Sequence, residues 1–84
     1  MRFDMYSVRD ELTGRFMNPL YVEQGEYSKP MATRQFKSQL NNIQLWKDNP
    51  SDYSLYLVGV FDDTEGAESV AIEKICSGRS VIDA

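Results

Sequence analysis

The chain has 84 residues, one cysteine and no histidine. A chain of this length buries only about 60–65% of its unfolded surface, so we expect a single small domain over residues 1–84 without a disulfide. The missing histidine removes the commonest general base and metal ligand, so no enzyme and no cofactor is expected. Because neither a membrane-spanning run nor a signal pattern appears, the sequence predicts a cytosolic protein with no membrane partner.

Charge is unevenly distributed along the chain, whose formal net charge is −4. Residues 1–47 carry seven Lys and Arg against five Asp and Glu, whereas residues 48–84 carry two against eight. An anionic partner is therefore expected to bind the first half.

The first predicted element is a β-hairpin. Residues 5–10 (MYSVRD) favour a strand, Thr13-Gly14 supplies a turn, and residues 15–23 (RFMNPLYVE) form the second arm. Pro19 has no N–H to donate, so the second arm is either an edge strand or broken at Asn18-Pro19. Alternation along this arm is expected to separate its apolar residues into two faces, Phe16, Leu20 and Val22 against Met17 and Tyr21.

A helix is predicted over residues 31–43, with Ser28 as a candidate cap and Pro30 in the first turn. Its apolar stripe follows steps of four, four and three residues and consists of Ala32, Phe36, Leu40 and Ile43. Trp46 is expected to fold back onto the core in a last turn.

The segment NPSDYSLYLVGVFDDTEG, residues 49–66, reads as turn, strand and turn. Residues 53–61 are apolar at odd and at even positions, as in a central strand covered on both faces or one with an aromatic exposed. Gly59 indicates a bulge or a close approach of neighbouring backbone. Residues 69–76 fit a short helix or a strand equally well, and residues 80–84 are expected to be loose.

These elements predict an α+β fold of the order β-β-α-β plus a short C-terminal element. A small antiparallel sheet, built from the β-hairpin and the central 53–61 strand, packs against one helix. Its unpaired edges and small core favour a homodimer. Residues 67–84 are then either a C-terminal extension or a segment exchanged between subunits.

Two features have a possible chemical reading. The acids Asp62, Asp63 and Glu65 resemble ligands for a hard cation, but they lack the spacing of a calcium loop, so we interpret them as a solvated turn and predict no metal. Cys76 is interpreted as a small, partly buried apolar residue rather than a nucleophile.

Cations and aromatic residues occur together early in the chain, as single-stranded nucleic acid binding requires. The competing interpretation is that the aromatics are core residues and the cations are merely solvated. The candidate DNA-binding residues are Tyr6, Arg9, Arg15, Phe16 and Tyr21 on the hairpin, and Arg34 and Lys37 on the helix.

The order of MYSVRDELTGRF, NPLYV, ATRQFKSQLNN and NPSDYSLYLVGVFDDTEG resembles the small nonstructural protein of gokushovirus-type microviruses, which are bacteriophages with single-stranded DNA genomes. In this sequence Val58 replaces the usual Leu, and Glu65 separates Thr64 from Gly66, which lengthens the last turn. The residues at matching positions are Phe36, Asn41, Pro50, Asp52, Tyr53, Leu55, Tyr56, Gly59, Phe61 and Asp62.

The resemblance implies a non-virion protein of phage DNA metabolism in the host cytoplasm. Its expected role is single-stranded DNA binding, or the switch from genome replication to packaging, and it supplies no catalytic residues. The alternative is a non-enzymatic interaction module that recruits a viral replication protein, a capsid protein or a host partner through the acidic second half.

Overall fold

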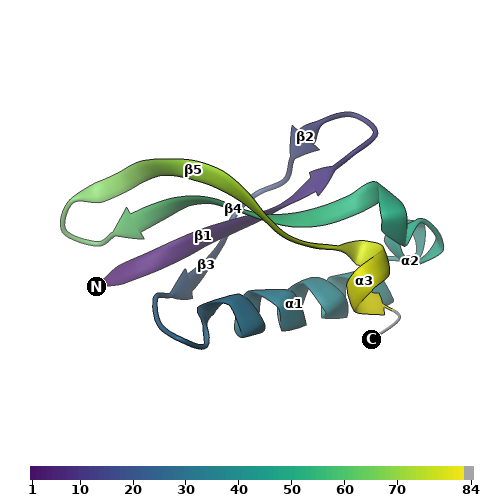
Figure 1. Ribbon diagram of the computed structural model, residues 1–84, viewed down its shortest axis with the longest axis horizontal. Helices are drawn as coiled ribbons and strands as arrows, with labels where there is room; N and C mark the ends of the chain where they lie inside the picture. Colours follow the sequence, from purple (N-terminus) through teal and green to yellow (C-terminus); the bar gives the residue numbers. More distant parts are fainter. Residues whose placement is uncertain (83–84) are drawn as a thin grey trace.

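The computed structural model describes residues 1–82 and consists of an antiparallel sheet with helices on one side of it (Figure 1). Within these residues the elements are, in order, β1 (Arg2–Asp10), β2 (Arg15–Phe16), β3 (Leu20–Glu23), α1 (Ser28–Asn42), α2 (Gln44–Asp48), the 3-10 turn η1 (Pro50–Asp52), β4 (Tyr53–Asp62), β5 (Gly66–Ser77) and α3 (Gly78–Ile82).

The predicted hairpin is confirmed, and its second arm is broken as Pro19 suggested. β2 and β3 pair with different parts of β1, and residues 17–19 separate them. The break changes which side chains of the arm share a face, because Phe16 pairs with Arg9 whereas Leu20 pairs with Tyr6. Positions 6 and 9 of one strand point to opposite faces, so the prediction that Phe16 shares a face with Leu20 is wrong.

β4 is the central strand, as predicted, with β1 on one side and β5 on the other. The pairing of β4 with both neighbouring strands shifts in register between Leu57 and Gly59, which confirms the bulge. A Cβ at this position would lie 3.2 Å from the carbonyl oxygen of Glu68 and 3.2 Å from Sδ of Met5, which confirms the close approach. Residues 69–76 form a strand rather than a helix, within β5.

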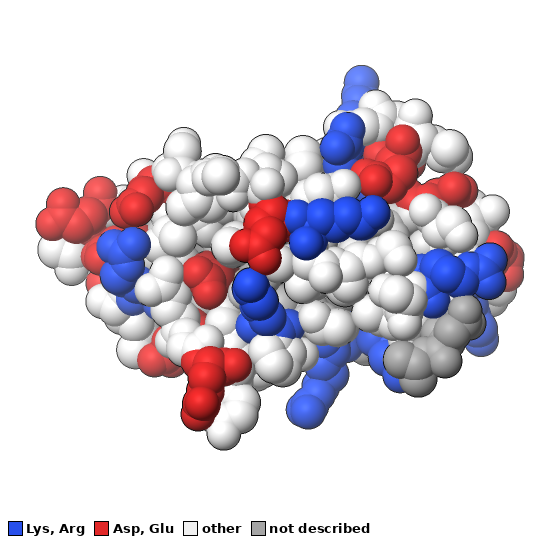
Figure 2. Space-filling view, viewed as in Figure 1, with Lys and Arg blue, Asp and Glu red and all other residues white. Residues whose placement is uncertain are grey.

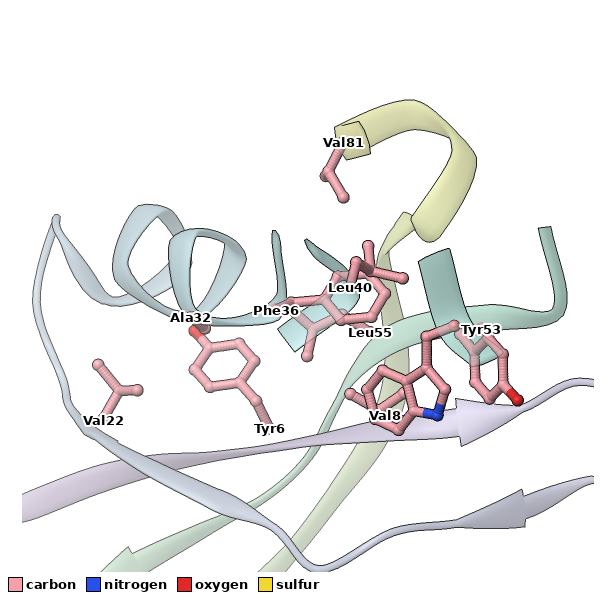
Figure 3. Packing of buried hydrophobic residues seen from close by; sticks show 10 residues of the cluster. Tyr6, Val8, Val22, Ala32, Phe36, Leu40, Tyr53, Leu55 and Val81 are labelled. Carbon is pink, nitrogen blue, oxygen red and sulfur yellow. The ribbon is translucent and has the colours of Figure 1, made fainter. Parts of the chain in front are cut away.

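One face of the sheet is covered by α1, and the core lies between them (Figure 3). Trp46 of α2 folds back as predicted and stacks on Tyr53, with ring centroids 4.8 Å apart and planes inclined at 21°. The other buried apolar residues of this core are Tyr6, Val8 and Val22 from the hairpin strands, Ala32, Phe36 and Leu40 from α1, Leu55 from β4 and Val81 from α3.

The predicted helix is confirmed but begins at Ser28, and two details of it are wrong. Ile43 is 38% exposed, because an extended residue at this position (φ −104°, ψ 109°) ends α1 before α2 begins. Ser28 makes no capping hydrogen bond. Its hydroxyl is buried and bonds to side chains of β1 instead.

The predicted order omitted several elements. α2, η1 and α3 accompany α1, so the prediction of a single packed helix is wrong, and β5 adds a twelve-residue strand. Within the predicted loose segment, Val81 is buried in the core, while residues 83–84 lie outside the described part. Residues 67–77 pair with β4 of the same chain.

Among the described residues, no helix lies on the opposite face of the sheet (Figure 1). Residues 1–82 also contain no helix long and apolar enough to cross a membrane. The face without a helix, called the open face below, contains side chains of Phe3, Met5, Arg9, Phe16, Tyr21, Tyr56 and Phe61, as the strand registers place them.

Candidate nucleic-acid interface

Three aromatic rings lie together at one end of the open face. Phe3 pairs with Phe61 across β1 and β4, and their ring centroids are 6.5 Å apart. Tyr21 of β3 meets Phe61 edge-on at 5.7 Å. The rings line a hollow of about 360 Å³, called the aromatic hollow below. Because Tyr21 remains 51% exposed, a ligand group can reach it.

A second aromatic group lies at the other end of the open face, next to the β1–β2 turn. Phe16 meets Tyr56 edge-on at 5.5 Å, and the guanidinium of Arg9 lies 5.6 Å from the first ring and 5.9 Å from the second. The hydroxyl of Tyr56 donates to the Glu11 carboxylate at 3.1 Å. We call Arg9, Phe16 and Tyr56 the cation–aromatic cluster.

The side chain of Arg9 is held by an ion pair and by two aromatic rings. Its Nε lies 3.4 Å from Oε1 of Glu11, which is ion-pair distance, but this buried nitrogen makes no hydrogen bond within residues 1–82. The contact with two ring faces compensates for part of its desolvation. The guanidinium is thus fixed in position with hydrogen-bonding capacity that is not fully used.

The prediction that Tyr6 offers a stacking face is wrong, because this side chain is 1% exposed and points from β1 toward α1 (Figure 3). Its hydroxyl lies 2.7 Å from Oγ of Ser28, which donates to Oδ2 of Asp4 at 2.6 Å. Burial raises the pKa of Tyr6 above its usual value. Tyr6 therefore joins the helix to the sheet and is not available to a base.

The remaining predicted residues do not form one surface. Arg9, Arg15, Phe16 and Tyr21 belong to the hairpin strands, whereas Arg34 and Lys37 lie on α1, which covers the opposite face. Arg34 is exposed, two positions beyond the buried Ala32. Since 3.6 residues make one turn, Arg34 points away from the sheet, and one strand of nucleic acid on the open face does not reach it.

Sequence reasoning missed four residues of the open face, namely Phe3, Tyr56, Phe61 and Lys74. Phe3 was missed because the strand begins at Arg2, before the alternation becomes visible. Lys74 comes next to Tyr56 only through the pairing of β5 with β4, and it is exposed. The alternation of residues 2–10 was the one local signal that could have included Phe3.

The two ends of the molecule differ in charge. Acidic residues gather at the left end of the molecule, where the β4–β5 turn lies, and most Lys and Arg lie toward the other end (Figure 2). In that turn Asp62 accepts the backbone N–H groups of Thr64 and Glu65, which lower the pKa of Asp62. Residues 1–82 contain no group of three or more potential metal-ligating side chains.

Cys76 is partly buried, and burial raises the pKa of its thiol. A raised thiol pKa disfavours the reactive thiolate at neutral pH. The structure therefore agrees with the interpretation of Cys76 as a partly buried apolar residue.

Fold and surface together define a small α+β domain whose antiparallel sheet has one face covered by helices and one open face with aromatic groups at both ends. The chain belongs to the Phage ORF5 protein family, which it matches over residues 3–81. The predicted phage origin is thereby confirmed. No curated protein and no solved structure matches the chain.

Proposed function

We propose that this phage protein is a nonstructural protein of the gokushovirus type that binds single-stranded DNA weakly and without sequence preference. The observation that carries the proposal is the cation–aromatic cluster, in which Arg9 lies over the rings of Phe16 and Tyr56 on the open face. Arginine and exposed aromatic rings are the two groups that sequence-tolerant single-strand binding uses.

Phe16 supplies the stacking face, since this residue is 40% exposed although its ring contacts Tyr56 and Arg9. Two exposed cations lie near it. Lys74 pairs with Tyr56 across β4 and β5 and shares the open face, whereas Arg15 precedes Phe16 in β2, pairs with Asp10 and points to the other side of the strand. Bases stacked on Phe16 would thus have phosphates within reach of cations, whereas a duplex keeps its base faces hidden.

The expected affinity is low, because the acidic residues outnumber the cations. The net charge is −4, and Glu11 lies beside Arg9. Weak, salt-sensitive binding suits a protein that covers newly made single strands and is displaced when the genome is packaged. A homodimer would double the contact area, and light scattering at increasing protein concentration measures the oligomeric state.

Fluorescence anisotropy with a labelled oligonucleotide at low salt tests the proposal. We expect single strands to bind more tightly than duplex of the same sequence. Phe16→Ala should weaken binding about 5- to 100-fold, since base stacking contributes about 1–3 kcal/mol. Tyr27→Ala is the matched control, because this exposed aromatic lies at the start of α1 and should leave affinity unchanged.

Two outcomes would contradict the proposal. One is no binding at about 300 µM protein, above the usual range for non-specific complexes. The other is an equal loss of affinity in Phe16→Ala and in Tyr27→Ala, which would place the contact elsewhere.

A further inference from the structure

The aromatic hollow differs from the cation–aromatic cluster in the charges around it. Glu23 is exposed and pairs with Phe3 across β3 and β1, so its side chain lies on the same face as that ring. Beyond Phe61 the chain turns through Asp62, Asp63 and Glu65, of which Asp62 lies at ion-pair distance from Arg2 and Asp63 from the N-terminal amine, whereas Glu65 is exposed. The hollow is apolar inside, and the four acids around it outnumber these two cations, with Glu23 on its own face.

This surface fits a particular kind of ligand. An apolar side chain can fill a hollow lined by Phe3, Tyr21 and Phe61, and cations beside it would meet the surrounding carboxylates. A phosphate backbone would meet the same carboxylates and be repelled. The charge pattern therefore favours a protein segment over nucleic acid at this end of the open face.

We propose that the aromatic hollow is a docking site for a protein segment in which an aromatic or large aliphatic residue is flanked by Lys or Arg. The site is separate from the cation–aromatic cluster, so one molecule can hold DNA at one end of its open face and a protein at the other. This docking role goes beyond the proposed DNA binding, because it gives the protein a way to bring a basic partner segment to the single-stranded DNA.

The size of the hollow agrees with a single anchoring side chain. A volume of about 360 Å³ is at the small end of ligand sites, and it lies open on a sheet face rather than within the core. Tyr21 and Phe61 meet edge-on, which leaves ring surface for an incoming side chain. Short anchored segments of this kind bind through a few central residues.

Labelled synthetic hexapeptides test the proposal on the full chain. We expect Lys-Lys-Phe-Leu-Lys-Lys to bind at least about tenfold more tightly than Glu-Glu-Phe-Leu-Glu-Glu and Lys-Lys-Ser-Ser-Lys-Lys. Amide chemical shifts should move at Phe3, Tyr21 and Phe61. If the serine peptide binds as tightly as the basic phenylalanine peptide, net charge alone explains the binding. If the acidic peptide binds as tightly, apolar contact alone explains it. Either result overturns the proposal.

Variants locate the site. Tyr21→Ala should lower the affinity for the basic peptide about tenfold, and Glu23→Lys should lower it several-fold. Phe16→Ala should leave this affinity unchanged. Both changed residues are exposed, and circular dichroism checks that the variants fold. If single-stranded DNA displaces the peptide, and Tyr21→Ala lowers the affinity for DNA as much as the affinity for the peptide, the hollow belongs to the DNA site and the proposal fails. Absence of DNA binding with retained peptide binding would leave it intact.

Discussion

The two faces of the sheet use similar residues for different purposes. On the covered face, Tyr6 of β1 is 1% exposed and packs with Phe36 of α1, which is also 1% exposed. On the open face, Phe3 of the same strand pairs with Phe61 beside a hollow. Aromatic residues on the covered face are buried in the core, whereas those on the open face keep ring surface exposed for a ligand. An aromatic residue near cations therefore indicates binding only when its face of the sheet is known.

The largest expected effect separates the two faces by stability. Phe36→Ala removes a fully buried ring and should lower the free energy of unfolding by about 3–5 kcal/mol. Tyr21→Ala on the open face should cost about 1 kcal/mol or less, since half of that ring is already in water. Urea unfolding monitored by circular dichroism measures both. Similar losses in the two variants would mean that the open face contributes to the core.

A smaller effect is expected from adding one methyl group on each face. Gly78 at the start of α3 is buried, and a Cβ there would overlap the carbonyl oxygen of Pro50 and lie 3.0 Å from that of Tyr53. Because backbone must move to make room, Gly78→Ala should cost about 1–3 kcal/mol.

The matched variant is Gly59→Ala, whose Cβ would meet the Met5 sulfur and the Glu68 carbonyl at 3.2 Å. We expect a smaller loss there, because a flexible methionine on the open face can move aside. Thermal unfolding of both variants compares them. Equal melting temperatures would contradict the idea that the α3 side is the more tightly packed one.

Alkaline pH should weaken the covered face. Burial is the main cause that raises the pKa of Tyr53, with the charges of Asp10 and Asp52 adding to it, and burial also raises the pKa of Tyr6. The unfolded chain then loses these protons first, near pH 10, so their contribution is present below that pH and is lost as pH rises further. Urea unfolding from pH 8 to 11 should therefore show falling stability above about pH 10. A Tyr53→Phe variant with the same alkaline loss as the wild type would contradict this.

Local features of the sequence were enough to predict the parts that depend on neighbouring residues. Pro19 breaks the second arm because it lacks an N–H, and the spacing of Ala32, Phe36 and Leu40 predicts the buried stripe of α1. Gly59 indicates the bulge for a similarly local reason. Each of these depends on backbone chemistry or on periodicity within one element.

The parts that failed depend on pairing between distant segments. Whether Tyr6 stacks on a base or enters the core is decided by which face α1 covers, and no residue near Tyr6 encodes that. Residues 69–76 were ambiguous until their pairing with β4 made them a strand, and α3 is fixed by the contact of Gly78 with η1. The two ends of the open face were not foreseeable, because they combine residues from β1, β2, β3, β4 and β5.

The smallest expected effect distinguishes the cations of the two faces by salt dependence. Each phosphate contact on single-stranded DNA releases counterions, so the logarithm of affinity should fall with the logarithm of salt concentration by about 0.7 per contact. Lys74→Ala, beside Tyr56 on the open face, should flatten that slope by about this amount. Arg34→Ala, on α1 behind the sheet, should leave it unchanged although both variants lose one positive charge.

Anisotropy titrations over a range of salt concentrations measure these slopes, and the equal change in net charge makes the two variants a matched pair. A purely long-range attraction would weaken binding in both variants alike, since it depends on total charge. A direct contact changes the slope only where the cation meets a phosphate. If Arg34→Ala flattens the slope as much as Lys74→Ala does, DNA follows the helical side of the molecule, and the division between a stabilising face and a binding face is wrong.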